Sequence, residues 1–363
     1  MDIDIILEPD VSPAQLAELA VAAENLGIRA IWSSNYHQDY DCFLALAPAA
    51  AATSKIILGA LAVSPWELHP LKMANAVMTL NEMSNGRAMI AISGGGGVLG
   101  ATGWKISKDG PIWPLKDESS GARYPERRVR GVQESIEVLE LARAGKLAFS
   151  YDGEIFQVTR PFQIKFGHQD TGPLIYGCCS GPMMVRMGAR LADGIQVSDF
   201  PVDMIPAAME NVRKGLAQRE KPAEDFRVGN FWAFHVKEDK DVAMYEARRE
   251  LIWRGAIAAK YEHEIAPHVD GEDEVKAVID NWDNFFKAFW TRSGKIDGVP
   301  EELVNKLIAG LSSAGDLSTL DAEIERFKAF RDTRLTELSL RLFDEPMAGL
   351  KIIGDRVLPA LRQ

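Results

Sequence analysis

The sequence predicts a (β/α)8 barrel, and three observations favour that fold class over an open, doubly wound sheet. Eight short apolar segments alternate along the chain with segments of helical periodicity. Within residues 172–200 two such strands are joined by one short helix, a connection that requires a parallel sheet. The length of 363 residues, 47% of them hydrophobic, suits one large barrel.

Cap and turn residues separate the elements in the first half of the chain. Strands are expected at residues 3–7, 30–33, 56–63 and 88–93. The first helix begins after the cap residue Ser12, has Pro13 in its first turn, and ends near Gly27. Further helices are expected at residues 43–52, 70–83 and 126–144. A polar excursion rich in glycine and proline, residues 99–125, separates the last two helices.

The second half of the chain continues the alternation. The fifth and sixth strands are expected at residues 174–178 and 195–198, with Pro182 in the first turn of the helix between them. The candidate packing residues of that helix are Met183, Met187, Ala189 and Leu191. The seventh strand and its long helix, then the eighth strand and the last helix, are expected at residues 226–236, 241–260, 337–343 and 348–361. A strand-like pair is expected around residues 148–158.

Residues 262–315 exceed what a barrel needs and are interpreted as a helical insertion. The aromatic residues of this charged segment are Trp282, Phe285, Phe286, Phe289 and Trp290. Burial of these rings against the barrel is the simplest interpretation, and a substrate pocket or a subunit interface are the alternatives. The chain is therefore expected to form one barrel domain, residues 1–363, with insertions at about 99–125 and 262–315.

The composition excludes several classes of partner. A formal net charge of −11 argues against nucleic acid and anionic membrane surfaces, because both bind basic patches. The cysteines Cys42, Cys178 and Cys179 do not suggest a disulfide framework, which indicates a reducing compartment. No apolar run is long enough to cross a membrane and the amino terminus lacks a signal-peptide pattern, so a cytoplasmic protein is expected. The six histidines lack metal-ligand spacing, and no metal site is expected.

The turn before the helix at Pro182 is a candidate phosphate site. The backbone N–H groups of Ser180 and Gly181 lie at the positive end of a helix dipole, where anions bind. An ordinary tight turn is the alternative interpretation. Cys178 and Cys179, at the end of the preceding strand, are expected to be small packing residues.

Several motifs of the chain together resemble one superfamily. They are Leu58-Gly-Ala-Leu-Ala-Val-Ser-Pro65, His69-Pro70, the run from Thr79 through Asn81 and Arg87 to Gly97, Ser150-Tyr-Asp-Gly-Glu-Ile-Phe156, and the run from Ser180-Gly-Pro to Ala192-Asp193-Gly194. The chain resembles the bacterial luciferase-like superfamily of flavin- or deazaflavin-dependent (β/α)8 barrels over most of residues 1–245. Within it, the sequence is most similar to F420-dependent reductases of the methylenetetrahydromethanopterin reductase type and to F420-dependent glucose-6-phosphate dehydrogenase.

The resemblance implies cofactor-binding residues at the carboxyl ends of the strands. It implies a non-prolyl cis peptide at Leu61-Ala62 behind the ring, with an ordinary strand end as the alternative. The glycine run after the fourth strand would let a planar ring lie close to the backbone, with a flexible linker as the alternative. The expected cofactor-binding residues are Leu61, Ala62, Gly94, Gly95, Gly96, Cys179, Ser180, Gly181 and Ser198.

The loop after the second strand is expected to supply the catalytic residues Asn35, Tyr36 and His37. F420-dependent relatives have an Asp-His pair in this loop, and the alignment puts Asn35-Tyr36 on it, with His37 one position later. An imidazole near the ring can move a proton at neutral pH or bond the ring edge, and a histidine in water is the alternative. His69, in the His-Pro motif, is expected to cap a helix or support the site, with catalysis as the alternative.

These features predict an oxidoreductase that transfers a hydride between deazaflavin F420 and a small organic substrate. An FMN-dependent, luciferase-like monooxygenase that uses reduced flavin and oxygen is the alternative. A cofactor-binding relative without turnover is the second alternative. Members of the superfamily commonly pair through barrel helices, so a homodimer or larger homo-oligomer is expected, with the helices at 70–83 and 126–144 as candidate interfaces.

Overall fold

A computed structural model describes residues 1–95, 127–145, 148–169 and 172–362, together with the backbone of four two-residue strands between residues 106 and 125. In this part of the chain eight parallel strands follow the closed order β1-β2-β3-β4-β11-β12-β13-β15, which confirms the predicted (β/α)8 barrel. The strands are β1 (Asp2–Leu7), β2 (Ala30–Ser34), β3 (Ile57–Val63), β4 (Ala88–Ile92), β11 (Leu174–Cys178), β12 (Gly194–Ser198), β13 (Arg227–Val236) and β15 (Glu337–Leu342).

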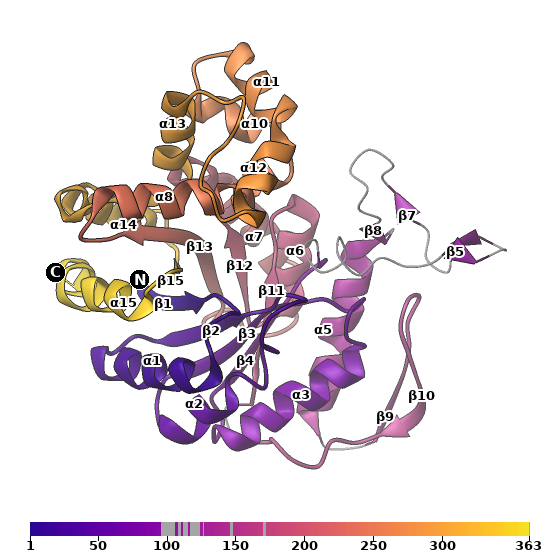
Figure 1. Ribbon diagram of the computed structural model, residues 1–363. Coiled ribbons are helices and arrows are strands. Elements are labelled where there is room, and N and C mark those ends of the chain that lie inside the picture. The colour runs from indigo at the N-terminus through magenta and orange to yellow at the C-terminus, as the bar shows by residue number, and fades with distance from the viewer. Residues whose placement is uncertain are drawn as a thin grey trace. The chain divides into compact units, whose positions relative to one another are not determined.

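The chain divides into two compact units, the first of which comprises Asp4–Gln196 and Ala208–Val228. Its helices are α1 (Pro13–Leu26), α2 (Ala47–Ala52), α3 (Pro70–Met83), α5 (Arg128–Ala144), α6 (Pro182–Leu191) and most of α7 (Ile205–Leu216). Helices α1, α2, α3 and α5 lie along the outside of β2, β3 and β4 (Figure 1).

Short antiparallel pairs lie outside the barrel strands of this unit. The strands β9 (Phe149–Asp152) and β10 (Gln157–Phe162) form the strand-like pair that the sequence predicts. Two smaller pairs join β5 (Ile106–Ser107) to β6 (Gly110–Pro111) and β7 (Leu115–Lys116) to β8 (Tyr124–Pro125).

The second unit comprises Met1–Ile3, Val197–Ala207 and Gly229–Gln363. Its helices are α8 (Lys240–Glu250), α9 (Gly255–Ala258), α10 (Glu262–Ile265), α11 (Glu272–Asp280), α12 (Trp282–Trp290), α13 (Glu301–Leu311), α14 (Leu320–Asp332), α15 (Pro346–Ile352) and α16 (Leu358–Arg362). The predicted insertion is thus helical, and the short strand β14 (Ser313–Gly315) follows it and pairs with the end of β13. Phe285 of α12 is buried in the core of this unit, whereas Trp290 is 46% exposed, so burial explains only part of the aromatic cluster.

The structure corrects several element predictions. The helix expected from residue 43 begins at Ala47, and the residues before it form separate hydrogen-bonded turns, because Pro48 has no backbone N–H to donate to the preceding turn. The helix expected to reach residue 260 ends at Glu250, and Arg254 is extended where its Nη1 lies 2.6 Å from Oδ1 of the buried Asp199. Met183 is 65% exposed, so its expected packing role is wrong.

Two helices, α7 and α14, were not predicted from the sequence. In α14 the buried residues Leu320, Ile324 and Phe327 follow one another at spacings of four and three. That spacing is the ordinary signature of an amphipathic helix. The signal was therefore present in the sequence, and the prediction was incomplete.

Motif residues of the superfamily resemblance secure the amino-terminal ends of the strands. Oδ1 of Asn81 accepts the N–H of Ala88 at 3.1 Å, and its Nδ2 donates to the carbonyl oxygen of Gly167 at 2.8 Å. Arg87 donates from Nη1 to the carbonyl oxygen of Ile56 at 2.7 Å. Asn81 is fully buried, so these bonds hold β3 and β4 at the end opposite to their carboxyl ends.

Asp193 has the same kind of role at β11 and β12. Its Oδ2 accepts the N–H of Ile175 at 2.8 Å and lies 2.5 Å from Nη1 of Arg143 on α5. Asp193 directly precedes Gly194, the first residue of β12. The motifs that identify the superfamily therefore include structural anchors, and the site must be sought at the other ends of the strands.

Two predictions concern parts of the chain that the structure does not test. Gly96 and most of the excursion at residues 99–125 lie outside the described residues. The single-domain organisation with two insertions stays a prediction.

Candidate active site

Asn35 joins the carboxyl ends of β2 and β3. Its backbone N–H donates to the carbonyl oxygen of Leu61 at 2.5 Å. Its side-chain Nδ2 donates to the carbonyl oxygen of Ala62 at 3.3 Å and also to Oε1 of Glu67. Three bonds therefore hold this corner, and Asn35, expected to be catalytic, contacts protein on its amide nitrogen.

The peptide between Leu61 and Ala62 is cis, as the resemblance implied. It lies where the register between β3 and β4 shifts, between Ala60 and Val63. Leu61 is buried and Ala62 is half-buried at this end of β3. Contact of either residue with a cofactor stays a prediction.

Trp32 of β2 fills the interior of the first unit, two residues before the carboxyl end of its strand. Its ring lies so close to Gly59 that a Cβ there would come within 2.2 Å of it. Its Nε1 donates to Asp4 at 3.0 Å, and its ring meets that of Tyr176 edge-on at 5.8 Å. Alternate residues of a strand share one face, so Ser34 points to the same interior, nearer the carboxyl end.

Buried polar atoms at the ends of β2 and β3 have no hydrogen-bond partner among the described residues. They include Oγ of Ser34, Nε1 of Trp66 and Oε2 of Glu67. Buried polar groups in native proteins are nearly always bonded to protein, water or ligand. This donor and acceptor set fits a bound molecule rich in nitrogen and oxygen atoms, such as a flavin-type ring.

Glu67 was not singled out from the sequence. Burial raises the pKa of its carboxyl, the backbone of Ser64 and the side chain of Asn35 oppose that effect, and Asp41 adds to it. The available signal was its position four residues after a predicted barrel strand, since chemistry in such barrels gathers at strand carboxyl ends.

Tyr36 and His37 continue the loop beyond Asn35. Their ring centroids lie 4.3 Å apart at an interplanar angle of 47°. Burial raises the pKa of the Tyr36 hydroxyl, and Asp39 raises it further. Tyr36 is half-buried while His37 is exposed, so solvent reaches the imidazole. The catalytic roles of both stay predictions.

His69 caps a helix, one of the two roles expected for it. Its Nδ1 accepts the N–H of Leu71 in the first turn of α3 at 3.2 Å. Its ring also meets Phe156 edge-on at 5.6 Å.

The glycine run begins directly after β4. The N–H of Ser93 donates to the carbonyl oxygen of Val63 at 3.0 Å, and the N–H of Gly95 donates to Oγ of Ser93 at 3.1 Å. Gly95 has a φ of 75°, a left-handed conformation that favours glycine. A Cβ on Gly94 would lie 3.4 Å from Cδ of Arg128, so this side chain comes close to the backbone here.

The turn before α6 is open. Gly181 is the N-cap residue, Pro182 is the first helical residue, and the helix has no side-chain cap among the described residues. A Cβ on Gly181 would meet nothing within 4 Å. Ser180, Gly181 and Pro182 are exposed, so an anion has access to this helix end.

Cys179 is buried, in contrast to the exposed residues Ser180 and Gly181 that follow it in the turn. Its N–H donates to the carbonyl oxygen of Gln196 at 2.8 Å. Its Sγ lies 3.2 Å from the Cβ position of Gly188 and 2.9 Å from that of Gly177. Burial raises the pKa of the thiol, and Cys178 adds to the effect. Cys179 thus packs α6 on β11 as expected, and its expected contact with a cofactor stays a prediction.

Ser198 ends β12 in the second unit. Its Oγ donates to Oδ2 of Asp199 at 3.0 Å. Asp199 has a φ of 57°, and its other oxygen holds Arg254, which is 1% exposed. A cofactor contact by Ser198 stays a prediction.

The second unit also contains a buried ionisable cluster at the ends of β13 and β15, which the sequence analysis missed. Nδ1 of His235 lies 2.8 Å from Oε1 of Glu246, whose Oε2 lies 2.9 Å from Nζ of Lys237. The ring of Phe343 stacks on His235 at 4.4 Å. Burial lowers the pKa of His235, although Glu246 opposes the shift. The signal was a histidine near the end of a largely apolar strand.

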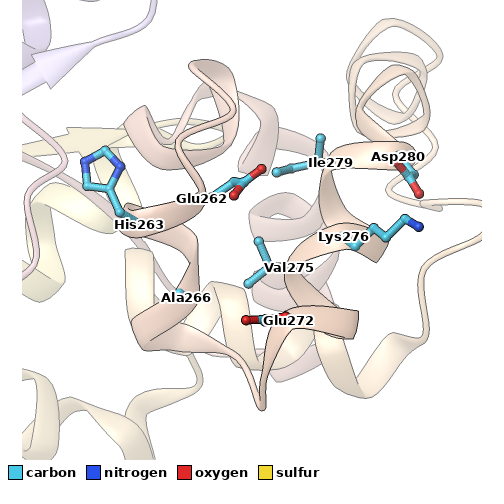
Figure 2. Close-up of a pocket in the computed structure, with 8 residues that line it drawn as sticks. All are labelled: Glu262, His263, Ala266, Glu272, Val275, Lys276, Ile279 and Asp280. Atoms are coloured by element: carbon cyan, nitrogen blue, oxygen red, sulfur yellow. The ribbon is translucent and has the colours of Figure 1, made fainter.

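The insertion contains a separate open cavity of about 890 Å³. Figure 2 shows Glu262 and Glu272 on its two sides, with Val275 between them. His263, Lys276 and Asp280 also line it, together with the apolar side chains of Ala266 and Ile279.

Two kinds of feature are absent from the described ranges. None of the described helices is long and apolar enough to cross a membrane. No group of three or more histidine, cysteine, aspartate or glutamate side chains in the described part of the chain is arranged to hold a metal ion. The absence of a metal site stays a prediction.

The chain is similar in sequence to known proteins over its whole length. The family model described as luciferase-like monooxygenase matches residues 3–318. The chain is 26% identical to a 5,10-methylenetetrahydromethanopterin reductase of Archaeoglobus fulgidus over 100% of both chains. It is 25% identical to the enzyme of the same name from Methanopyrus kandleri, over 99% of this chain and 98% of the relative.

Solved structures share the fold. The F420-dependent tetrahydromethanopterin reductase of Methanopyrus kandleri superposes with a TM-score of 0.73 at 21% identity, covering 99% of this chain and 98% of the other. An F420-dependent secondary alcohol dehydrogenase, solved with an F420-acetone adduct, gives a TM-score of 0.71 at 15% identity, covering 100% and 99%.

Proposed function

The chain belongs to the luciferase-like monooxygenase family, and on that premise we propose that it is an oxidoreductase that transfers a hydride between coenzyme F420 and a small organic substrate. The observation that carries this proposal is the similarity to methylenetetrahydromethanopterin reductases over the whole length of both chains. The predicted F420 dependence agrees with the names of the F420-dependent tetrahydromethanopterin reductase and the F420-dependent secondary alcohol dehydrogenase whose structures share this fold. When bound, the deazaflavin ring accepts or gives the hydride.

The carboxyl ends of β2, β3 and β4 would hold the ring. Leu61 and Ala62 would lie behind it, and the glycines Gly94 and Gly95 would let it approach the backbone. The unpartnered Oγ of Ser34 and Oε2 of Glu67 support this placement, because a heterocycle offers them hydrogen-bond partners.

The open turn at Ser180 and Gly181 would bind a phosphate of the cofactor tail. The exposed backbone N–H groups and the dipole of α6 favour an anion there, and nothing occupies the Cβ position of Gly181 within 4 Å. His37 would move a proton to or from the substrate, since it is exposed beside the half-buried Tyr36.

Titration of the purified protein with F420 and, separately, with FMN tests the cofactor. We expect saturable F420 binding, followed by the change in its visible absorbance and fluorescence. Tight FMN binding with oxygen consumption, and no F420 binding, would instead favour the monooxygenase alternative. Two findings support considering the monooxygenase alternative. The family is described as luciferase-like monooxygenase, and a long-chain alkane monooxygenase shares the fold with a TM-score of 0.68 at 13% identity.

We also propose a cytoplasmic homodimer or larger homo-oligomer with one barrel domain per chain. Cys42, Cys178 and Cys179 form no disulfide bond, which agrees with a reducing compartment. Met83 at the end of α3 and Leu141 on α5 are 49% and 39% exposed, as apolar residues at an interface would be in the isolated chain. Sedimentation that shows a 40.0 kDa monomer at micromolar concentration would contradict the assembly.

A further inference from the structure

The side-chain amide of Asn35 has both of its hydrogens in use. One points to the carbonyl oxygen of Ala62 and the other to Oε1 of Glu67. An amide carries two N–H donors and one carbonyl acceptor. Among the described residues, no donor reaches Oδ1 of this half-buried side chain, so Oδ1 is the atom that remains for a bound molecule.

Glu67 is itself held by a tight turn. Its N–H donates to the carbonyl oxygen of Ser64 at 3.1 Å, while the N–H of Trp66 donates to Oγ of Ser64 at 3.3 Å. Ser64 is fully buried. The carboxyl of Glu67 therefore reaches Asn35 from a fixed backbone, across 32 residues of sequence.

The two acceptors decide the orientation of the amide. A flipped amide would place Oδ1 of Asn35 against the carboxyl oxygen of Glu67, and two acceptors with no hydrogen between them repel each other. Glu67 thus permits only one orientation of the Asn35 amide. The other bond of the amide, from Nδ2 to the carbonyl oxygen of Ala62, is long at 3.3 Å and would hold that orientation less firmly by itself.

We propose that Glu67 is a positioning residue that fixes the Asn35 amide so that Oδ1 faces the bound ring and accepts a hydrogen bond from a ring N–H. This inference rests on the proposed function, because the ring is that of the proposed cofactor. The ligand chemistry it requires is a planar heterocycle with an amide-like N–H at its edge. Glu67 itself acts through Asn35.

The test is a set of F420 titrations with Glu67→Ala, Glu67→Gln and Asn35→Ala. Glu67→Ala removes the acceptor, and we expect the Kd for F420 to rise about tenfold, the usual effect of one hydrogen bond. Glu67→Gln keeps a carbonyl acceptor for Nδ2, so its Kd should stay within about twofold of wild type. The Asn35→Ala/Glu67→Ala double variant should bind no more weakly than Asn35→Ala, because Glu67 acts only through Asn35.

His69→Ala is the matched control. It loosens the helix start two residues after Glu67 without touching Asn35, and we expect it to lower the melting temperature but leave the Kd unchanged.

Equal Kd values for wild type and Glu67→Ala would overturn the inference, as would full additivity in the double variant. Loss of affinity in Glu67→Gln equal to that in Glu67→Ala would also overturn it, because the charge and not the acceptor would then matter. If the wild-type protein binds no F420, the proposed function itself is overturned. The variants test only the role of Glu67 and leave the proposed function untouched.

Discussion

Gly181→Asp separates cofactor binding from folding at the predicted phosphate turn. The backbone φ of Gly181 is −73° and its Cβ position is empty within 4 Å, so any side chain fits without strain. An aspartate at the N-cap accepts the free N–H groups of the first turn of α6 and favours its dipole. The unliganded variant should therefore be as stable as wild type or a few tenths of a kcal/mol more stable.

The same carboxylate should repel a phosphate from the turn. Two unit charges 4 Å apart interact with about 1 kcal/mol in water and about 4 kcal/mol near a protein surface. This turn is exposed, so we expect a loss of about 1.5–3 kcal/mol, which is a rise in Kd of about 10- to 100-fold.

The assay pairs a fluorescence titration of F420 with thermal unfolding of the unliganded protein. Gly181→Ala is the control, because it adds the Cβ without the charge and should bind F420 as wild type does. Weak binding should thus accompany unchanged or higher stability in Gly181→Asp alone. Wild-type affinity in Gly181→Asp, or equal losses in both variants, would refute the phosphate role of this turn.

Three further predictions concern turnover and stability. His37→Ala should lower kcat by about 100-fold or more and leave the Kd for F420 within about twofold, measured by steady-state kinetics and titration, and an unchanged kcat would remove the proton-transfer role. Asp193→Ala should lower the free energy of unfolding, measured by urea denaturation, by about 2–4 kcal/mol, because Arg143 and the N–H of Ile175 lose this partner. The Kd for F420 should stay unchanged, and a large change in Kd would contradict a purely structural role of Asp193. Burial raises the pKa of Glu24, but the N–H groups of Ile56, Lys55 and Ser54 have the larger combined effect and lower it from 4.5 to about 2. The ionised carboxylate therefore stabilises the folded protein above pH 4.5, and this stabilisation is lost as the pH falls toward 2. Glu24→Gln should accordingly cost about 1 kcal/mol at pH 6, after allowance for solvent screening, and much less at pH 2.5; an equal cost at both pH values would show that ionisation is not involved.

Local chemistry explains which elements the sequence predicts correctly. Ser12 accepts the N–H of Gln15 at 3.3 Å and Gly27 adopts a φ of 74°, as a cap and a helix stop should. Pro182 begins α6 as expected. Such signals act within a few residues, so they can be recognised without knowing what the segment packs against.

The errors arise where a distant contact overrides local preference. Arg254 leaves the helical path in order to reach Asp199, 55 residues away, and no periodicity in residues 241–260 contains that information. Met183 occupies an apolar position in its helix yet stays exposed, because it lies in the first turn of α6, directly after the exposed residues Gly181 and Pro182.

The sequence by itself determined the barrel, its strand order and the family, because hydrophobic periodicity and turn residues act over short distances and the motifs are contiguous. Only the tertiary structure decided how the site is built. Ala62 and Glu67 lie 27 and 32 residues after Asn35 in the chain, and their bonds to Asn35 exist because parallel strands bring their carboxyl ends to one edge. The structure likewise assigned the motif residues Asn81, Arg87 and Asp193 to the opposite end, since hydrogen-bond partners depend on where strands meet in space and not on their order along the chain.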